Sequence, residues 1–341
     1  MDKYILSDEN SVYFECGFSC DNVIFVRFGC DSFFVTDARY TIEAREKVKN
    51  AQVVEAQNLP KAVRNLLRIH KIKKIFFDPK ELDYATYQEL TKNTQTKFVA
   101  HKNISKQKRI IKTVDEISLL KNGADLGRGV FSSLSDFLNQ SRNLSEIDIF
   151  AKTKELMTNC FRRDVSFEPI TAINENSAKP HALPEHDKIL HNGDLLLVDA
   201  GLKFERYCSD RTFTFSSDFG FGSDSRNQKF KNNKMQNVYD VTLKAQQEAI
   251  SRARTGMKAF EIDKIARDII AENGYGKYFI HSTGHGVGLD IHELPVISAK
   301  SDTVIEDGMV FTVEPGIYLP NEFGVRIEDM VVMKNGRAEI L

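Results

Sequence analysis

The stretch LLLVDAGLKFERYCSDRTFTF, from Leu195 to Phe215, decides how this chain is interpreted. Two runs in which apolar residues predominate flank a polar patch, Lys203 to Arg206. Apolar runs on either side of a short polar patch are typical of two antiparallel strands joined by a tight turn. The stretch therefore predicts a β-hairpin that carries acidic residues on both arms.

The two aspartates of this hairpin face each other in the register that the pattern suggests. A turn centred between Phe204 and Glu205 places Asp199 opposite Asp210. Directly opposed side chains on one face of a sheet have Cβ atoms about 4.5–5.5 Å apart. Two carboxylates at that distance repel each other, and a cation between them removes the repulsion. The pair is therefore a candidate metal site.

A second acidic hairpin follows near the C-terminal end, in MVFTVEPGIYLPNEFGVRIEDMVVM (309–333). Its two apolar runs are separated by Pro, Asn and Gly, the residues that form turns. A turn centred on Asn321 sets Glu314 opposite Glu328. Two hairpins with facing acidic pairs predict an internally pseudo-symmetric antiparallel fold.

Between the hairpins lies HSTGHGVGLDIHELP, from His281 to Pro295. This run holds three of the chain's 8 histidines, interleaved with glycines that allow close backbone approach. A lone histidine on an apolar strand is usually a hydrogen-bonded core residue. Three histidines in one glycine-rich run, beside two acidic pairs, favour metal binding and catalysis instead.

Four carboxylates and one imidazole form an oxygen-rich ligand set. Such a set suits Mn²⁺, with Co²⁺, Fe²⁺ or Zn²⁺ as substitutes. Four carboxylates are too many for one small ion and suit a pair of ions about 3.5–4 Å apart. A paired site can activate a water and polarise a carbonyl, which is the chemistry of amide hydrolysis.

The composition is that of a globular protein with two domains. The chain has 341 residues, of which 41% are hydrophobic and 28% charged. A formal net charge of -1 gives no overall attraction to nucleic acid or to anionic lipid. Basic stretches at 61–74 and 101–112 are interpreted as a solvated helix face and an interdomain linker.

The location predicted from the sequence is the cytoplasm. No run approaches the roughly 18 apolar residues of a membrane span, and the sequence MDKYILSDEN lacks the pattern of a secretory signal. The Cys count of 5 is odd and the cysteines are scattered, which favours free thiols in a reducing compartment.

The first hundred residues mix short apolar runs with helical patterns. The segments 23–28, 32–37 and 74–79 predict strands, and 41–50 and 60–68 predict helices. A capping box at Thr113 and Glu116 then predicts a long helix. We therefore expect a small α/β domain over 1–112 and a catalytic domain over 113–341.

Two further segments of the second domain are informative about local structure. Apolar residues at steps of three and four predict a packed helix over 260–270, ended at Gly274. The polar segment 216–237, rich in Ser, Asp, Asn, Lys and Gly, predicts a mobile surface loop.

Taken together, these motifs resemble the proline-specific peptidases of the "pita-bread" fold, the Xaa-Pro aminopeptidases and Xaa-Pro dipeptidases. FFVTDARYTIEA resembles the creatinase-like N-terminal domain of that family. VDAGLKFERYCSD, HSTGHGVGLDIHELP, GMVFTVEPGIY and GVRIED follow in the family's order. The resemblance implies an α/β (α+β) protein, with a small α/β domain before a catalytic domain of antiparallel sheet and flanking helices.

The resemblance also implies metal ligands. Asp199 would bind one ion, Asp210 and Glu328 would bridge both ions, and His285 and Glu314 would bind the other. The carboxylate of Glu314 would also steer the proton of the attacking water.

Further roles follow from the same resemblance. His292 would hydrogen-bond the scissile carbonyl and steady the tetrahedral intermediate, and His181 would be a further histidine on the substrate side. Arg326 would orient a ligand carboxylate. Tyr318 falls in the site region without an assigned role. The partners implied are short peptides with proline at the second position, and the assembly implied is a homodimer.

Two positions depart from the family pattern. Where the family often has Arg in a Thr-Arg-Thr run, this chain has Phe213, so either a contact to a ligand is lost or Arg211 replaces it. Where related dipeptidases carry Arg to hold the dipeptide's carboxylate, this chain has Val296. The second departure favours an Xaa-Pro aminopeptidase over an Xaa-Pro dipeptidase.

Three other interpretations remain. A methionine aminopeptidase shares the catalytic fold and ligands, but the N-terminal domain argues against it. A creatine-type amidinohydrolase needs no metal, and a non-catalytic pita-bread binding protein typically loses ligands. The complete ligand set argues against both.

Overall fold

The computed structural model describes residues 2–160 and 162–341 of the 341-residue chain. The chain divides into two units, the first ending at Arg109 and the second beginning at Ile110. Each unit has its own hydrophobic clusters, so each is described separately.

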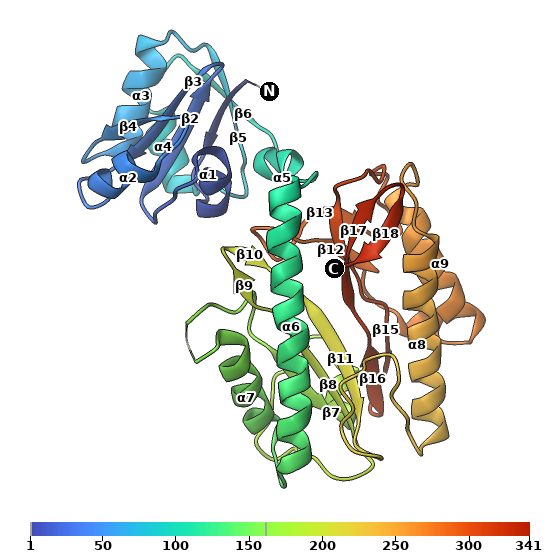
Figure 1. Cartoon of the computed structure of the whole chain (residues 1–341). Coiled ribbons are helices and arrows are strands. Elements are labelled where there is room, and N and C mark those ends of the chain that lie inside the picture. Colours follow the sequence, from blue (N-terminus) through green and yellow to red (C-terminus); the bar gives the residue numbers. More distant parts are fainter. Residues whose placement is uncertain (1, 161) are drawn as a thin grey trace. The chain divides into compact units, whose positions relative to one another are not determined.

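The first unit is a six-stranded mixed sheet with helices on both faces (Figure 1). Strands β1 to β3 are antiparallel neighbours, and β4, β5 and β6 join the sheet in parallel. Helices α3 and α4 pack on one face, and α1, α2 and α5 pack on the other. The expected α/β arrangement is therefore confirmed. The elements are β1 (Lys3–Leu6), α1 (Glu9–Cys16), β2 (Val23–Phe28), β3 (Asp31–Thr36), α2 (Thr41–Lys47), β4 (Gln52–Glu55), α3 (Leu59–Ile69), β5 (Lys74–Phe77), α4 (Tyr84–Thr91), β6 (Lys97–Ala100) and α5 (Ile104–Lys108).

The second unit has two halves, each a pair of helices against strands. Figure 1 shows its strands between α6 and α7 on one side and α8 and α9 on the other. The first half comprises α6 (Val114–Gln140), α7 (Glu146–Thr158), β7 (Ile170–Ile173), η1 (Asn174–Ala178), β8 (Leu195–Ala200), β9 (Lys203–Phe204), β10 (Tyr207–Cys208) and β11 (Arg211–Ser216). The second comprises α8 (Asn233–Arg252), α9 (Ala259–Glu272), η2 (Gly276–Tyr278), β12 (Gly284–Gly286), β13 (Glu293–Ile297), β14 (Val310–Val313), β15 (Gly316–Leu319), β16 (Phe323–Arg326), β17 (Asp329–Lys334) and β18 (Arg337–Ile340).

The helix ends follow the predicted capping. The hydroxyl of Thr113 accepts the N–H of Glu116, whose carboxylate accepts the N–H of Thr113, so the capping box of α6 is confirmed. Helix α9 ends before Gly274, which has φ +84°, a conformation that glycine adopts without strain.

The first acidic hairpin has a different register from the one predicted. Phe204 pairs with Tyr207, so the turn is centred between Glu205 and Arg206. Along β8 and β11, Asp199 therefore lies opposite Thr212 and not opposite Asp210. The shift is two residues, so both aspartates stay on one face of the hairpin, because side chains alternate with a period of two.

The second acidic hairpin has the predicted register. In β15 and β16, Gly316 pairs with Arg326, and in β14 and β17, Val313 pairs with Asp329. Glu314 and Glu328 lie between these two ladders in the same register, and Asn321 is at the turn with φ +60°.

The predicted mobile loop over 216–237 is wrong in two respects. Ser216 belongs to β11, and α8 begins at Asn233. The segment between them is also packed, because Ser225, Gln228 and Phe230 are buried. Most of its other residues are exposed, as the prediction of a surface loop requires, and several of its polar side chains also bond backbone groups.

No helix in residues 2–160 and 162–341 is both long enough and apolar enough to cross a membrane. All five cysteines lie in the described part of the chain and are free thiols.

Candidate metal centre

The four carboxylates and the imidazole singled out from the sequence come together in the second unit. The ligand atoms of Asp210, His285 and Glu328 lie within 4.8 Å of one another. His285 Nε2 lies 3.5 Å from Asp210 Oδ2 and 3.3 Å from Glu314 Oε1. Asp199 joins the group from the end of β8. Each acidic residue lies at or next to the end of a strand, so the backbone fixes where its side chain begins.

The tautomer of His285 suits metal binding. Its Nδ1 lies 3.1 Å from the carbonyl oxygen of Gly286, which can only accept a hydrogen bond. Nδ1 therefore carries the proton, and the lone pair of Nε2 points at the carboxylates. Burial and, to a smaller extent, the neighbouring His292 lower the pKa of His285 to about 4, so the ring is neutral at pH 7.

The carboxylates are buried together with too little positive charge from the protein. Burial raises the pKa of Asp210 and Glu328 well above the usual range, and the other acidic residues of the site add to the effect. Burial also raises the pKa of Glu314 to about 8. Asp199 Oδ1 and Glu328 Oε1 are buried and have no hydrogen-bond partner among the residues that the structure describes. Buried carboxylate oxygens of this kind normally coordinate metals or pair with cations, so the residues fit a divalent metal centre.

A hydrogen-bond frame supports these ligands, and the sequence indicated only one of its members, Arg326, through the family resemblance. Arg326 Nη2 donates to Asp199 Oδ2 over 2.8 Å, and its Nε donates to Thr212 Oγ1 over 3.0 Å. The hydroxyl of Thr212 in turn donates to Glu328 Oε2 over 2.7 Å. Arg326 and Thr212 thus hold one ligand from each hairpin. Thr212 lies two residues beyond Asp210, on the same strand face, and that spacing is the signal that could have identified it.

The frame extends to two aromatic residues. Arg326 Nη1 donates to Tyr318 Oη over 2.7 Å, and Tyr318 Oη lies 2.9 Å from His281 Nε2. Burial raises the pKa of Tyr318 to about 12 and lowers that of His281 to about 4. Both are therefore neutral at pH 7. Tyr318, left without a role by the sequence, holds the guanidinium, and His281, the first histidine of the glycine-rich run, has a contact that the sequence did not predict.

The two histidines expected on the substrate side are both exposed, in contrast to His285. The rings of His285 and His292 have centroids 4.3 Å apart and are nearly perpendicular. His181 follows Pro180, whose carbonyl accepts a hydrogen bond from Arg326.

The segment that carries His181 is anchored by a buried carboxylate. Glu146 accepts the N–H groups of Ile173 and Glu185 over 2.6 and 2.8 Å, and the amide of Asn176 over 2.7 Å. These bonds fix both ends of the segment, so His181 is held in place from outside the metal centre.

Phe213 contributes nothing to the metal centre. Its ring stacks between Phe131 and Phe215 and is fully buried on the opposite face of the strand. Arg211 does not replace the missing arginine either, because it lies on that opposite face and pairs with Asp329 over 3.4 Å.

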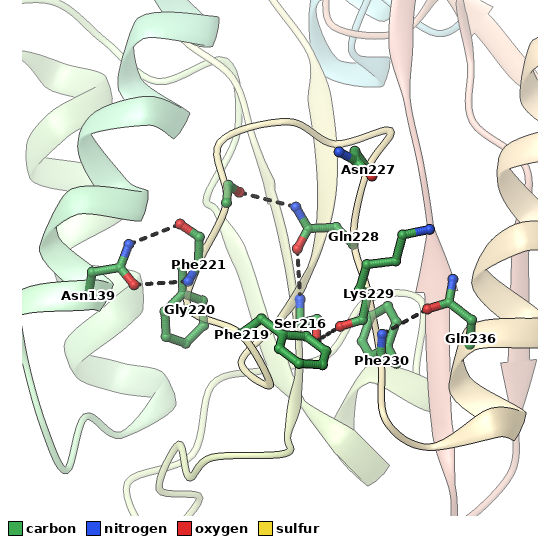
Figure 2. Close-up of a pocket in the computed structure, with 11 residues that line it drawn as sticks. Asn139, Ser216, Phe219, Gly220, Phe221, Asn227, Gln228, Lys229, Phe230 and Gln236 are labelled. Carbon is green, nitrogen blue, oxygen red and sulfur yellow. Dashed lines mark hydrogen bonds between the residues drawn. The ribbon is translucent and has the colours of Figure 1, made fainter.

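A separate hollow of about 670 Å³ lies at the segment between β11 and α8 (Figure 2). The residues that the structure places around it include no acidic residue, histidine or cysteine. The amide of Gln228 is satisfied there by Ser216, Gly222 and Asp224. This hollow offers no metal ligand, so it is not the catalytic site.

Fold and site together define a metal-dependent peptidase. The model of metallopeptidase family M24 matches residues 118–335, and that of the creatinase/prolidase N-terminal domain matches residues 1–111. The chain therefore belongs to metallopeptidase family M24, as a pita-bread Xaa-Pro peptidase with a creatinase-like N-terminal domain.

Named relatives carry both activities of this group. An Xaa-Pro dipeptidase from Pyrococcus furiosus is 38% identical over 262 residues, covering 76% of this chain and 71% of the relative. The structure of an Xaa-Pro dipeptidase from Bacillus anthracis matches with a TM-score of 0.90 at 31% identity, covering 99% of this chain and 92% of the other. That of an X-Pro aminopeptidase from Thermotoga maritima matches with a TM-score of 0.85 at 29% identity, covering 100% and 95%.

Proposed function

We propose that this protein is an Xaa-Pro aminopeptidase, which removes the N-terminal residue from peptides with proline second and prefers peptides longer than two residues. The observation that supports the preference is the place of Val296. It pairs with His285 in the ladder of β12 and β13, and directly paired side chains share one face of a sheet. Position 296 therefore lies beside a metal ligand, and valine offers no partner to the terminal carboxylate of a dipeptide.

Each residue of the site would have a different role in hydrolysis. When bound, a pair of divalent ions would polarise the scissile carbonyl and activate a water. Glu314 would accept a proton from that water and pass it to the leaving proline nitrogen. His292 would donate a hydrogen bond to the carbonyl oxygen as negative charge develops on it, and His181 would contact the substrate.

The ligand assignment supports two ions rather than one. Asp199 would hold one ion, His285 and Glu314 the other, with Asp210 and Glu328 between them. Four carboxylates with one imidazole favour Mn²⁺, with Co²⁺, Fe²⁺ or Zn²⁺ as substitutes. Metal analysis of the purified protein tests both the number and the identity of the ions.

An Xaa-Pro dipeptidase is the second candidate, and the names of the Pyrococcus and Bacillus relatives favour it. The two candidates differ in where the substrate's free carboxylate lies. The experiment compares kcat/KM for Ala-Pro and Ala-Pro-Ala in the presence of Mn²⁺. A higher value for the tripeptide supports the aminopeptidase, and a clear preference for the dipeptide contradicts it.

We further propose that the protein works as a homodimer in the cytoplasm. The exposed free thiols Cys30 and Cys160 fit a reducing compartment. Sedimentation of the metal-loaded protein tests the assembly.

A further inference from the structure

The backbone between His285 and His292 packs against the buried carboxylate of Glu293. Glu293 Oε1 accepts the N–H of Asp290 over 3.1 Å, and the carbonyl of Asp290 accepts the N–H of Gly288 over 3.1 Å. A Cβ atom at Gly288 would lie 2.5 Å from Glu293 Oε2, so only glycine permits this approach. The segment 287–292 is thus built directly on the carboxylate.

The carboxylate is neutralised by a lysine from far away in the sequence. Lys112 Nζ lies 2.9 Å from Glu293 Oε2, and the two side chains are 1% and 0% exposed. The backbone of Lys112 is fixed as well, because its N–H donates to the carbonyl of Gly308 over 2.8 Å. The ammonium therefore reaches Glu293 from an anchored position.

A fully buried ion pair is weak evidence of stabilisation. Removing two charges from water costs several kcal/mol for each ion, and apolar pairs of similar size often give equal or greater stability. What such a pair can provide is a single conformation of the backbone around it. Here that backbone includes the peptide bond between His292 and Glu293.

We propose that Lys112 and Glu293 are positioning residues for His292. They hold the segment 287–292 so that the His292 ring stays at its place beside His285, with ring centroids 4.3 Å apart. The other end of the segment has its own support, since Cys208 donates its N–H to the carbonyl of Gly288 over 2.8 Å. The ion pair therefore acts on the end nearest His292. The inference rests on the catalytic role proposed for His292.

The test uses the variant Lys112→Met/Glu293→Gln, which removes both charges and leaves neither partner charged and buried. The glutamine oxygen can still accept the N–H of Asp290. The matched control is Lys154→Met/Glu168→Gln, which makes the same two substitutions in an ion pair of 2.7 Å whose side chains are 35% and 65% exposed. Each of these two double substitutions is introduced both into the wild-type protein and into the His292→Ala variant.

We expect the buried-pair variant to keep its metal content and to lose about 10-fold to 10²-fold in kcat, because a displacement of about 1 Å has that effect. The loss should disappear in the His292→Ala protein, where there is no imidazole left to position. The control pair should change kcat in neither protein. An equal loss with and without His292, or no loss at all, would overturn the proposal.

A second readout does not depend on activity. Hydrogen exchange of the metal-loaded protein should become faster at the amides of residues 287–292 in the buried-pair variant, with β14 unchanged. If the wild-type protein cleaves neither Ala-Pro nor Ala-Pro-Ala, the proposed function fails, and this measurement still decides whether the ion pair holds the segment. Unchanged exchange there would refute the positioning role.

Discussion

The hydroxyl of Thr212 donates a hydrogen bond of 2.7 Å to Glu328, and so links the two acidic hairpins. The same oxygen accepts a hydrogen bond of 3.0 Å from Arg326. Thr212 Oγ1 thus sets the orientation of one ligand and of the cation that neutralises another. Such supporting contacts typically contribute 10- to 100-fold to metal affinity.

Thr212→Val removes these bonds with almost no change in volume. The other oxygen of Glu328 is buried and has no partner in the described part of the chain, so the variant leaves the carboxylate with no hydrogen bond from this frame. We expect Mn²⁺ to bind about 10- to 100-fold more weakly, measured by titration of metal-free protein.

Thr242→Val is the matched control, since Thr242 is also fully buried and its hydroxyl donates only to a carbonyl within α8. If both variants bound Mn²⁺ like the wild-type protein, the assignment of Thr212 would be wrong.

The sequence predicts one hairpin register correctly and the other incorrectly, and the turns explain why. At the second hairpin Asn321 has φ +60°, a conformation that asparagine accepts readily. At the first, Glu205 and Arg206 occupy the two turn positions with φ +47° and +73°. Two-residue turns with positive φ normally use Asn and Gly, so no residue pattern in the sequence indicated the position of this turn.

The wrong register of the first hairpin did not affect the predicted ligands, because a shift of two residues keeps both aspartates on the same face of the strands. The hydrogen-bond frame was harder to predict, because its members meet only in the folded chain. The resemblance indicated that Arg326 orients a ligand carboxylate but not which one, because its partner Asp199 is 127 positions away and no local pattern encodes such a distance. Spacing within a strand could have suggested Thr212, but His281 and Tyr318 required the fold.

The two neighbouring histidines of the glycine-rich run should respond differently to replacement by alanine. His285 offers a neutral Nε2 to the carboxylates, so His285→Ala should lose bound metal. His292 is exposed and adjacent, so His292→Ala should keep its metal and lose about 10²–10³ in kcat. Metal content and kcat of both variants are measured side by side. Equal metal content in the two would contradict this division of roles.

Metal uptake should release protons near neutral pH. In the metal-free protein burial raises the pKa of Glu314 to about 8, and those of Asp210 and Glu328 are also raised. Glu314 is therefore largely protonated at pH 7 and must lose this proton to bind metal, and the raised pKa values of Asp210 and Glu328 act in the same direction. Calorimetric titration with Mn²⁺ in two buffers of different ionisation enthalpy measures the release. Identical heats in both buffers would show that no protons are released and would refute the prediction.

The same groups give the metal-free protein a characteristic pH dependence of stability. An acid whose pKa is raised on folding contributes stability at low pH, and this contribution is lost as the pH rises through the native pKa. For Glu314 the loss runs from about pH 4.5 to about pH 8. In EDTA, the temperature of thermal unfolding should therefore fall as the pH rises across this range. The increase in unfolding temperature on adding Mn²⁺ should become larger with rising pH. A gain that is constant with pH would contradict the assignment.

The last prediction concerns substrate length. Val296 is 38% exposed and pairs across the ladder with His285, so an arginine in its place would reach the face that carries the ligands. An arginine can make two charge-assisted hydrogen bonds with a carboxylate, and valine makes none. We expect Val296→Arg to raise kcat/KM for Ala-Pro relative to Ala-Pro-Ala by about 10-fold, the effect of roughly 1.4 kcal/mol. The control is Val304→Arg, which adds the same charge at a valine that is 47% exposed and lies beside Lys258, at the start of α9. That variant should leave the ratio unchanged. If Val296→Arg left it unchanged as well, position 296 would have no part in choosing between dipeptides and longer peptides.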